Sequence, residues 1–304
     1  MKILVIFTGG TIGSTLADGW IAPNDTTRYT LIHSYEEKYG KDVCFETRTP
    51  FSILSENLSA KTLKELVDEV SAAIKEDYDG IIVTHGTDTL QFSAAALAYA
   101  TGNDCMPVVL VSSNYPLEDE RTNGNANFKA AVDFIKNGCG RGVFISYKNE
   151  NKTVMFHNAL VTLDHLEAND ALFSMYGKVY AKETENGIEV LSTSEPCEKL
   201  PAKFAEDSGI LTVELHPADG YTYALENYKA VILRPYHSGT LNTDSPAFKA
   251  FCERAKALGI PVYVVNILNG AAYESAKTYE ELGITPMCDT TFAAAYVKLW
   301  MQLS

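Results

Sequence analysis

Short runs of apolar residues alternate along the first half of the chain with segments in which apolar residues recur every three to four positions. The runs are rich in Val and Ile, as buried strands are, and the recurring segments have the period of an amphipathic helix. We expect strands near 2–7, 43–48, 80–84, 107–112 and 143–147, and helices near 61–76, 89–101 and 125–136. This alternation of strands and helices predicts a parallel sheet covered by helices.

The segment 61–76 shows the helical period most clearly. Its apolar residues fall on one stripe, which consists of Leu63, Leu66, Val67, Val70 and Ala73. Charged residues occupy the opposite side, so we expect the stripe to face the sheet and the charged side to face water.

The pattern changes after about residue 150. Polar, hairpin-like segments extend to residue 191, and Glu185-Asn186-Gly187 separates two strand-like runs as a turn does. The segment 192–207 contains two prolines and little apolar periodicity, which is typical of a linker.

A second series of strands and helices then begins, with strands expected at 210–214, 229–233 and 261–265 and helices at 245–258 and 290–302. We therefore expect an N-terminal domain over 1–191, a linker over 192–207 and a smaller C-terminal α/β domain over 208–304.

Composition narrows the possible partners. The 304 residues are 46% apolar and 21% charged, as in soluble proteins of about two domains. The net charge is −14 and no run of Lys and Arg interrupts the acidic background, so nucleic acids and anionic membranes are poor partners. The first apolar run, Ile3-Leu4-Val5-Ile6-Phe7, is too short for a secretion signal or a membrane span, and we expect a cytoplasmic protein.

The cysteines and histidines are scattered. The six cysteines form no CxxC pair, and the six histidines form no HxxxH or HExxH spacing. We therefore expect neither a disulfide framework nor a metal site, and no cofactor.

A loop rich in glycine and threonine follows the first strand at once. Thr8-Gly9-Gly10-Thr11-Ile12-Gly13-Ser14 would lie at the carboxyl end of the sheet, where open α/β folds bind ligands. A phosphate-binding GxGxxG motif does not fit, because Thr8 stands at the first glycine position. By itself the loop is also compatible with a simple glycine turn.

A second loop of the same kind is Thr84-His85-Gly86-Thr87-Asp88-Thr89, which follows the strand near 80–84 and opens the next helix. Thr87 or Asp88 is compatible with a helix cap. Two such turns in one sheet also suit a hydroxyl nucleophile, a carboxylate that binds an amine, and N–H groups that stabilise an oxyanion. We expect His85 to make structural hydrogen bonds rather than transfer protons.

At these two loops the sequence resembles the L-asparaginase family, whose signature segments are TGGTI and HGTDT. Weaker resemblance continues through Ser112-Ser113-Asn114-Tyr115-Pro116-Leu117 and reaches the C-terminal region. The resemblance implies a larger N-terminal flavodoxin-like parallel-sheet domain and a smaller C-terminal α/β domain. It also implies hydrolysis of L-asparagine to L-aspartate and ammonia without metal or cofactor, in a homodimer or homotetramer.

The resemblance assigns roles to individual residues. Thr11 would be the nucleophile, Thr87 the second hydroxyl of the site, and Asp88 the group that binds the substrate's α-ammonium. Ser55 would hold the α-carboxylate with Glu56 beside it, although Ser55 also suits a cap for the helix that begins near Ala60. The expected substrate-binding residues are Gly10, Ser55, Glu56, Gly86, Asp88 and Ser112.

Two positions depart from the family. Trp20 stands where the family has a tyrosine that assists the first threonine, and an indole N–H can donate a proton but cannot accept one. Leu163 stands where the family has a lysine, and no lysine occurs between Lys152 and Lys178. A replacement would come from a mobile loop or a neighbouring subunit, and the candidates are Tyr29, Lys148, Lys178, Tyr273 and Tyr279.

Several functions therefore remain open. The chain is either an amidohydrolase acting on asparagine, or a catalytically impaired family member that binds an amino acid or regulates another protein. Glutamine or a longer amide is an alternative substrate, because one methylene changes binding by only about 1–3 kcal/mol. The amidase component of a tRNA-dependent amidotransferase shares both loops but normally has an extra N-terminal domain, whereas Met1 here leads directly into the first strand.

Overall fold

The computed structural model describes the backbone of residues 1–304 except 18–19, 24–26, 167, 194–196 and 268–272, and it describes no side chains over 14–28. Contacts divide the chain into two compact units, Met1–Ala202 and Lys203–Ser304. The domain and linker boundaries expected from the sequence stay a prediction.

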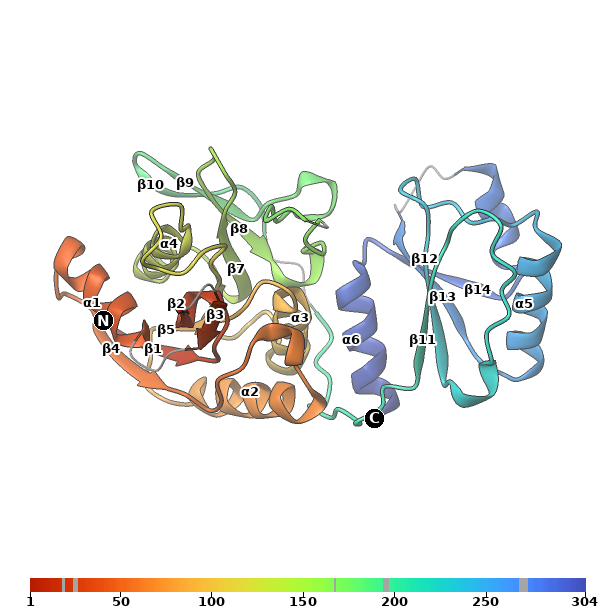
Figure 1. Ribbon diagram of the computed structural model, residues 1–304, viewed down its shortest axis with the longest axis horizontal. Coiled ribbons are helices and arrows are strands. Elements are labelled where there is room, and N and C mark those ends of the chain that lie inside the picture. Colours follow the sequence, from red (N-terminus) through yellow and green to blue (C-terminus); the bar gives the residue numbers. More distant parts are fainter. Residues whose placement is uncertain (18–19, 24–26, 167, 194–196, 268–272) are drawn as a thin grey trace. The chain divides into compact units, whose positions relative to one another are not determined.

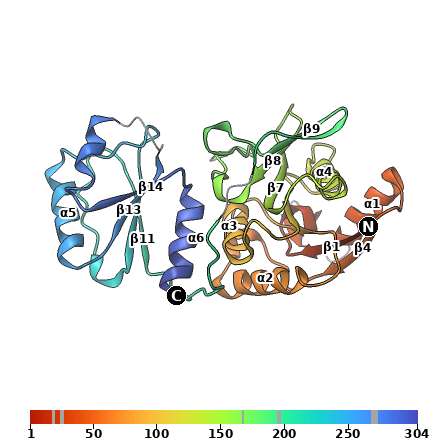
Figure 2. The same ribbon diagram turned by 180° about the vertical axis from the view of Figure 1, so that it is seen from behind.

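The first unit is built on an eight-stranded sheet in the order β10-β9-β8-β7-β6-β5-β1-β4 (Figures 1 and 2). Its strands are β1 (Lys2–Phe7), β4 (Cys44–Arg48), β5 (Gly80–Thr84), β6 (Pro107–Val111), β7 (Gly142–Lys148), β8 (Val154–Asn158), β9 (Ala181–Thr184) and β10 (Gly187–Val190). Strands β4, β1, β5, β6 and β7 are parallel, as expected. Strands β8, β9 and β10 add an antiparallel edge, so the sheet is mixed, and β8 was not predicted.

Helices cover both faces of this sheet. On one face lie α2 (Ala60–Ala73) and α3 (Leu90–Thr101), and on the other lie α1 (Thr27–Tyr39) and α4 (Gly124–Lys136) (Figure 1). The predicted apolar stripe of α2 is confirmed, because all five of its members are buried. Helix α1 was not predicted. Its polar and apolar residues follow no strong helical period, and it packs on the fold through Leu31 and Tyr35.

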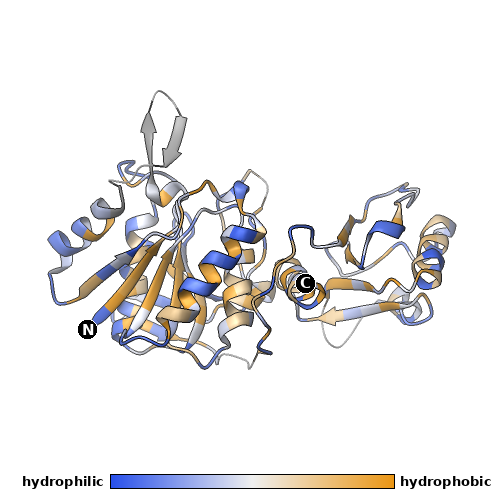
Figure 3. Cartoon of the chain, turned by 90° about the horizontal axis from the view of Figure 1, so that it is seen from below, coloured by the Kyte–Doolittle hydropathy of each residue, from blue (hydrophilic) through white to orange (hydrophobic). Residues whose placement is uncertain are grey.

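The central strands carry the core and align the two threonine loops. All residues of β5 and β6 are buried, and Figure 3 shows the hydrophobic colour concentrated on these strands. In β1 only the first residue is partly exposed. Because β1 and β5 are parallel neighbours with Phe7 paired to Thr84, the loops that follow them begin at the same level of the same sheet edge.

The second unit is a four-stranded parallel sheet in the order β11-β12-β13-β14. Its strands are β11 (Ile210–Glu214), β12 (Ala230–Arg234), β13 (Val262–Ile267) and β14 (Ile284–Cys288), of which β14 was not predicted. Helices α5 (Pro246–Ala257) and α6 (Phe292–Leu303) lie on opposite faces of it (Figures 1 and 2). Among the described residues, no helix is long and apolar enough to span a bilayer.

Candidate active site

The two threonine loops touch through their glycines. Gly10 has a φ of +74°, a conformation that side chains disfavour, and a methyl group placed on it would lie 2.3 Å from the backbone nitrogen of Gly86. Position 10 therefore requires glycine if the backbones are to approach this closely. Thr11 follows Gly10 and Thr87 follows Gly86 in the sequence, so each threonine begins next to the contact between the two loops.

A third segment joins the first loop. The Gly10 N–H donates to the Ile53 carbonyl at 2.9 Å, and the Ile53 N–H donates to the Thr8 carbonyl at 3.0 Å. These bonds extend the β1–β4 side of the sheet by one bridge beyond its strands. Ser55 lies two residues later, in the short helical turn Ser55–Asn57, and is thereby brought to the same edge.

Ser55 and Asp88 form a reciprocal pair. The Ser55 hydroxyl donates to Asp88 Oδ2 at 2.9 Å, and the Asp88 backbone N–H donates back to Ser55 Oγ at 3.2 Å. The Thr89 hydroxyl donates to the Ser55 carbonyl at 2.9 Å. A methyl group on Gly86 would lie 2.4 Å from Ser55 Oγ. Four of the predicted residues, Gly10, Ser55, Gly86 and Asp88, thus occupy one small region.

The alternative roles as helix caps do not hold. Helix α2 has Ser59 at its N-cap, where Ser59 and Thr62 form a capping box, so Ser55 is not its cap. Helix α3 has Thr89 at its N-cap without a side-chain capping bond, because the Thr89 hydroxyl binds Ser55 instead. Asp88 likewise directs its carboxylate to Ser55 rather than to a helix N–H.

The predicted residues differ in their access to solvent. Asp88 and Glu56 are exposed, and Thr11 and Thr87 are half-buried. Ser112, just beyond β6, is completely buried, and its Oγ has no hydrogen-bond partner in the described part of the chain. A ligand that enters from solvent can therefore reach Asp88, Glu56 and the two threonines, Thr11 and Thr87.

His85 is held in the interior by both ring nitrogens. Nδ1 lies 2.8 Å from the Gly86 carbonyl, which only accepts, so Nδ1 carries the proton. Nε2 lies 2.8 Å from Ser93 Oγ and accepts from that hydroxyl. Burial lowers the pKa of His85 below its usual value, so the ring is neutral at pH 7. The predicted structural hydrogen bonds of His85 are confirmed.

The segment that would carry the family lysine lies beside helix α3. Gln91 Nε2, in the first turn of α3, donates to Asp164 Oδ1 at 3.0 Å, and the backbone N–H of Leu163 donates to the Phe173 carbonyl at 2.9 Å. A carboxylate thus stands next to Leu163 on this side. The backbone of Trp20 pairs with Ala17 in the hairpin of β2 (Ser14–Ala17) and β3 (Trp20–Pro23), and its side chain lies outside the described residues.

The five proposed replacements lie in different surroundings. Tyr29 is 61% exposed, Lys148 ends β7, and the Lys178 ammonium lies 5.6 Å from the centre of the Tyr176 ring. Tyr273 and Tyr279 belong to the second unit, where Tyr273 is 64% exposed. The buried Tyr279 donates its hydroxyl to the Gly239 carbonyl at 2.9 Å. The hydroxyl of Tyr279 is therefore already engaged.

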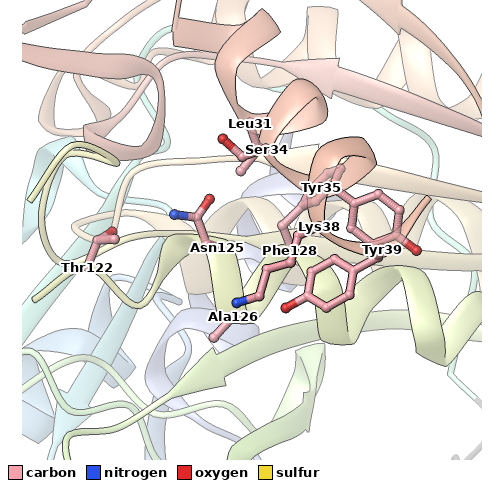
Figure 4. A pocket seen from close by; sticks show the side chains of 9 residues that line it. All are labelled: Leu31, Ser34, Tyr35, Lys38, Tyr39, Thr122, Asn125, Ala126 and Phe128. Atoms are coloured by element: carbon pink, nitrogen blue, oxygen red, sulfur yellow. The ribbon is translucent and has the colours of Figure 1, made fainter. Parts of the chain in front are cut away.

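A separate cavity of about 280 Å³ lies between α1 and α4 (Figure 4). Tyr35, Lys38, Asn125 and Phe128 are among its lining residues, and none of the predicted site residues lines it. Among the described residues, no group of three or more His, Cys, Asp and Glu side chains is arranged to hold a metal ion. The threonine loops therefore remain the best candidate for chemistry.

Known proteins resemble the chain over its whole length. The family model described as "Asparaginase, N-terminal" matches residues 2–194. L-asparaginase 1 of Escherichia coli (strain K12) is 26% identical over 332 residues, covering 100% of this chain and 92% of its own. A glutamyl-tRNA(Gln) amidotransferase component of Sulfurisphaera tokodaii is 25% identical, covering 100% of this chain and 70% of its own. The crystal structure of L-asparaginase I from Vibrio cholerae superposes with a TM-score of 0.79 at 21% identity, covering 99% of this chain and 92% of that one.

Proposed function

The chain belongs to the asparaginase family, and on that premise we propose that it hydrolyses L-asparagine to L-aspartate and ammonia with Thr11 as nucleophile. The observation that carries this proposal is the contact of Gly10 with Gly86, beside which Ser55 binds Asp88. This contact brings a hydroxyl, a carboxylate and backbone N–H groups together at the carboxyl ends of two neighbouring strands.

The Ser55–Asp88 pair suits the head group of an amino acid. The Asp88 carboxylate would accept hydrogen bonds from the α-ammonium, and the ammonium would replace the Ser55 hydroxyl as its donor. The released Ser55 hydroxyl would then donate to the α-carboxylate. One anion and one neutral donor side by side fix the direction in which a zwitterion binds.

With the head group fixed, the side-chain amide would reach the threonines. The Thr11 oxygen attacks the amide carbon, the carbonyl electron pair moves to oxygen, and backbone N–H groups of the glycine turns stabilise that oxyanion. The carbon–nitrogen bond breaks, the amide nitrogen takes the proton that the Thr11 hydroxyl gave up on attack, and ammonia leaves. Water then attacks the acyl-threonine ester, the bond from the acyl carbon to Thr11 breaks, a proton of the water returns to Thr11, and aspartate is released. Thr87 contributes the second hydroxyl, and Gly10, Gly86, Glu56 and Ser112 shape the pocket.

A second candidate function is binding of an amino acid with little turnover. The observation that favours it is the Gln91–Asp164 bond beside Leu163, where a carboxylate stands next to the position of the family lysine. Glutamine as the amide substrate and a role like that of the amidotransferase component are variants of the same site.

Ammonia release from L-asparagine, with L-glutamine in parallel, tests the proposal directly. An amidohydrolase releases ammonia and aspartate in equal amounts. A binding protein gains thermal stability from L-aspartate, by RT ln(1 + [L]/Kd), without turnover. Absence of both effects would contradict both functions.

We further propose that the protein works in the cytoplasm as a homodimer or homotetramer, with an N-terminal domain over 1–191 and a C-terminal domain over 208–304. Light scattering of the purified protein at micromolar concentration measures its mass, and a monomer of 33.3 kDa would contradict the assembly.

A further inference from the structure

The 162–174 loop, which follows β8, is fixed to the sheet. Thr162 and Ser174 pair as a bridge that closes its base. The Tyr147 hydroxyl of β7 donates to the Asp170 carbonyl at 2.7 Å. The side-chain amide of Asn149 exchanges two bonds with the backbone of Leu172, at 2.8 and 2.9 Å. The described side chains of this loop, which exclude that of residue 167, therefore have defined positions relative to the strands.

His165 on this loop has one engaged nitrogen and one that is not. Nδ1 lies 3.2 Å from the Ala171 carbonyl, which only accepts, so Nδ1 carries the proton. In the neutral ring this leaves Nε2 as an acceptor. Nε2 is buried and has no hydrogen-bond partner in the described part of the chain. A buried acceptor without a partner is costly and calls for a functional or water-mediated explanation.

The loop places His165 next to the turn that carries Thr87 and Asp88. Gln91 lies between them, with its amide nitrogen 3.0 Å from Asp164 Oδ1 and 3.5 Å from the Asp88 carbonyl oxygen. The amide oxygen of Gln91 is buried and also lacks a partner among the described residues. The 162–174 loop and α3, which Gln91 joins, thus each carry one buried acceptor without a partner.

The titratable groups around His165 come from its own loop, from the turn before α3, and from strands β7 and β8. The carboxylates of Asp88, Asp164 and Asp170 each raise its pKa, and burial lowers the pKa more, so the net shift is downward from the usual 6.5. Tyr147 of β7 lies edge-on, with ring centres 5.4 Å apart, and burial raises the pKa of Tyr147 to about 12. His157 of β8 is buried with a pKa of about 4. At pH 7 the three rings are uncharged, and His165 is an available base beside a carboxylate.

We propose that His165 takes the place of the family lysine, as the proton acceptor that serves Thr87 through one water molecule. This inference rests on the proposed function. In the second half-reaction, the attacking water forms its bond to the acyl carbon and its proton passes to Thr87. The Thr87 proton passes to His165 Nε2. When the bond from the acyl carbon to Thr11 breaks, Thr11 keeps the electron pair and receives the proton back along the same path, so that protons and charge balance.

The first half-reaction uses the same path. The Thr11 hydroxyl proton passes by way of Thr87 to His165 as the carbon–oxygen bond forms. The imidazolium then returns it to the amide nitrogen as the carbon–nitrogen bond breaks, and ammonia leaves. His165 holds this proton more readily than an isolated imidazole would in the same burial, because Asp88 and Asp164 stabilise its charged form. It is therefore a positioned base that acts through Thr87 and water.

The decisive variant is His165→Asn, whose amide nitrogen can still donate to the Ala171 carbonyl but which has no basic nitrogen. We expect kcat for L-asparagine to fall by about 10²- to 10⁴-fold with KM within about threefold of wild type. In wild type kcat falls as the pH drops through the pKa of His165, below 6.5, and the variant loses this acidic limb. Added imidazole should partly restore His165→Ala.

Two matched histidine variants serve as controls. His157→Asn removes another buried ring with an unpartnered Nε2, but its Nδ1 binds Ser174 rather than anything near Gln91. We expect His157→Asn to lower the thermal stability and to keep the fall of kcat at low pH. His33→Asn changes an exposed ring on α1 and should change neither. Unchanged kcat and an unchanged acidic limb in a folded His165→Asn protein would overturn the role of His165 while leaving the proposed function intact.

If wild type releases no ammonia, the proposed function fails. The pH dependence of L-aspartate binding then tests whether His165 lies next to the bound ligand. A bound carboxylate near Nε2 raises the pKa of His165, so binding takes up a proton and tightens from pH 8 to pH 5.5. His165→Asn should make the affinity independent of pH over this range. The same pH dependence in wild type and variant, measured by thermal shift, would overturn the inference.

Discussion

The contact between the loops after β1 and β5 and the neighbouring 162–174 loop, which Gln91 joins to α3, are held in different ways. In the first region the backbones of Gly10 and Gly86 lie so close that a methyl group on Gly10 would be 2.3 Å from the Gly86 nitrogen, and a methyl group on Gly86 would be 2.4 Å from Ser55 Oγ. The second is held by side chains, through Tyr147 and Asn149 to the loop and through Gln91 to Asp164. The first arrangement tolerates almost no substitution, whereas the second allows its residues to change provided that the loop stays anchored.

The same two regions differ in how far the chain keeps the pattern of its family. The TGGTI and HGTDT segments are matched residue for residue, and the close contact between the loops requires the glycine at position 10. Leu163 and His165 lie on the 162–174 loop, which is held by the hydrogen bonds of Tyr147, Asn149 and Gln91 rather than by a close backbone contact. Substitutions that act on one region and not on the other test this distinction.

Thr11→Val should have the largest effect. Valine has nearly the shape of threonine but no hydroxyl, so kcat should fall at least about 10⁴-fold while the thermal unfolding transition stays cooperative. Ammonia release in long incubations measures the residual rate. More than one percent of wild-type activity would remove Thr11 from the role of nucleophile.

Gly10→Ala should break the contact itself. The added methyl group would lie 2.3 Å from the Gly86 nitrogen at a φ of +74°, so we expect a loss of about 3 kcal/mol or more of folding stability, together with activity. Gly13→Ala is the matched control, because no described atom lies within 4 Å of its added methyl group. Urea unfolding compares the two, and equal stability of both variants would contradict the close contact.

Asp88→Ala should weaken binding more than folding. Removal of the carboxylate leaves the α-ammonium without its partner and should cost about 2–5 kcal/mol of L-aspartate affinity. Asp88→Asn keeps the shape and the backbone bond to Ser55 but not the charge, and it should lose most of the same affinity. Calorimetric titration measures both. Succinate, which lacks the amino group, provides the check, since wild type should bind it far more weakly than aspartate.

Ser59→Ala should have the smallest effect and concern the fold alone. It removes the capping box of α2 and should cost about 1 kcal/mol of stability. Ser55→Ala, four residues earlier, should instead reduce affinity for L-aspartate because it removes the bond to Asp88. If Ser59→Ala lost as much affinity for L-aspartate as Ser55→Ala, the position of the site would depend on the N-terminus of α2 and not on the Ser55–Asp88 pair.

The sequence predicted those parts of the fold in which local pattern and burial coincide. Strands β1, β5, β6 and β7 and helix α2 combine continuous apolar runs or a clear apolar stripe with nearly complete burial. Helix α1 has no such stripe, and β8 has a polar His157 inside a buried strand. Antiparallel pairing of β8 with β7 depends on residues far from either local pattern.

The candidate site divides in the same way. Gly10, Gly86 and Asp88 were found because short motifs determine their geometry, and Ser55 was assigned beside them. The role that we propose for His165 was not predicted, because its unpartnered nitrogen depends on Ala171, Tyr147 and burial together. The available signal was a histidine two residues after Leu163, where a base was wanted, but only the folded loop brings it next to α3.

Steady-state release of ammonia from L-asparagine at pH 8, by wild type and Thr11→Val side by side, tests the central claim most directly. We predict that wild type releases ammonia and L-aspartate in a one-to-one ratio and that Thr11→Val releases less than about 10⁻⁴ as much. A wild-type rate no higher than that of Thr11→Val, with both proteins folded and binding L-aspartate, would contradict the claim that this chain is an amidohydrolase.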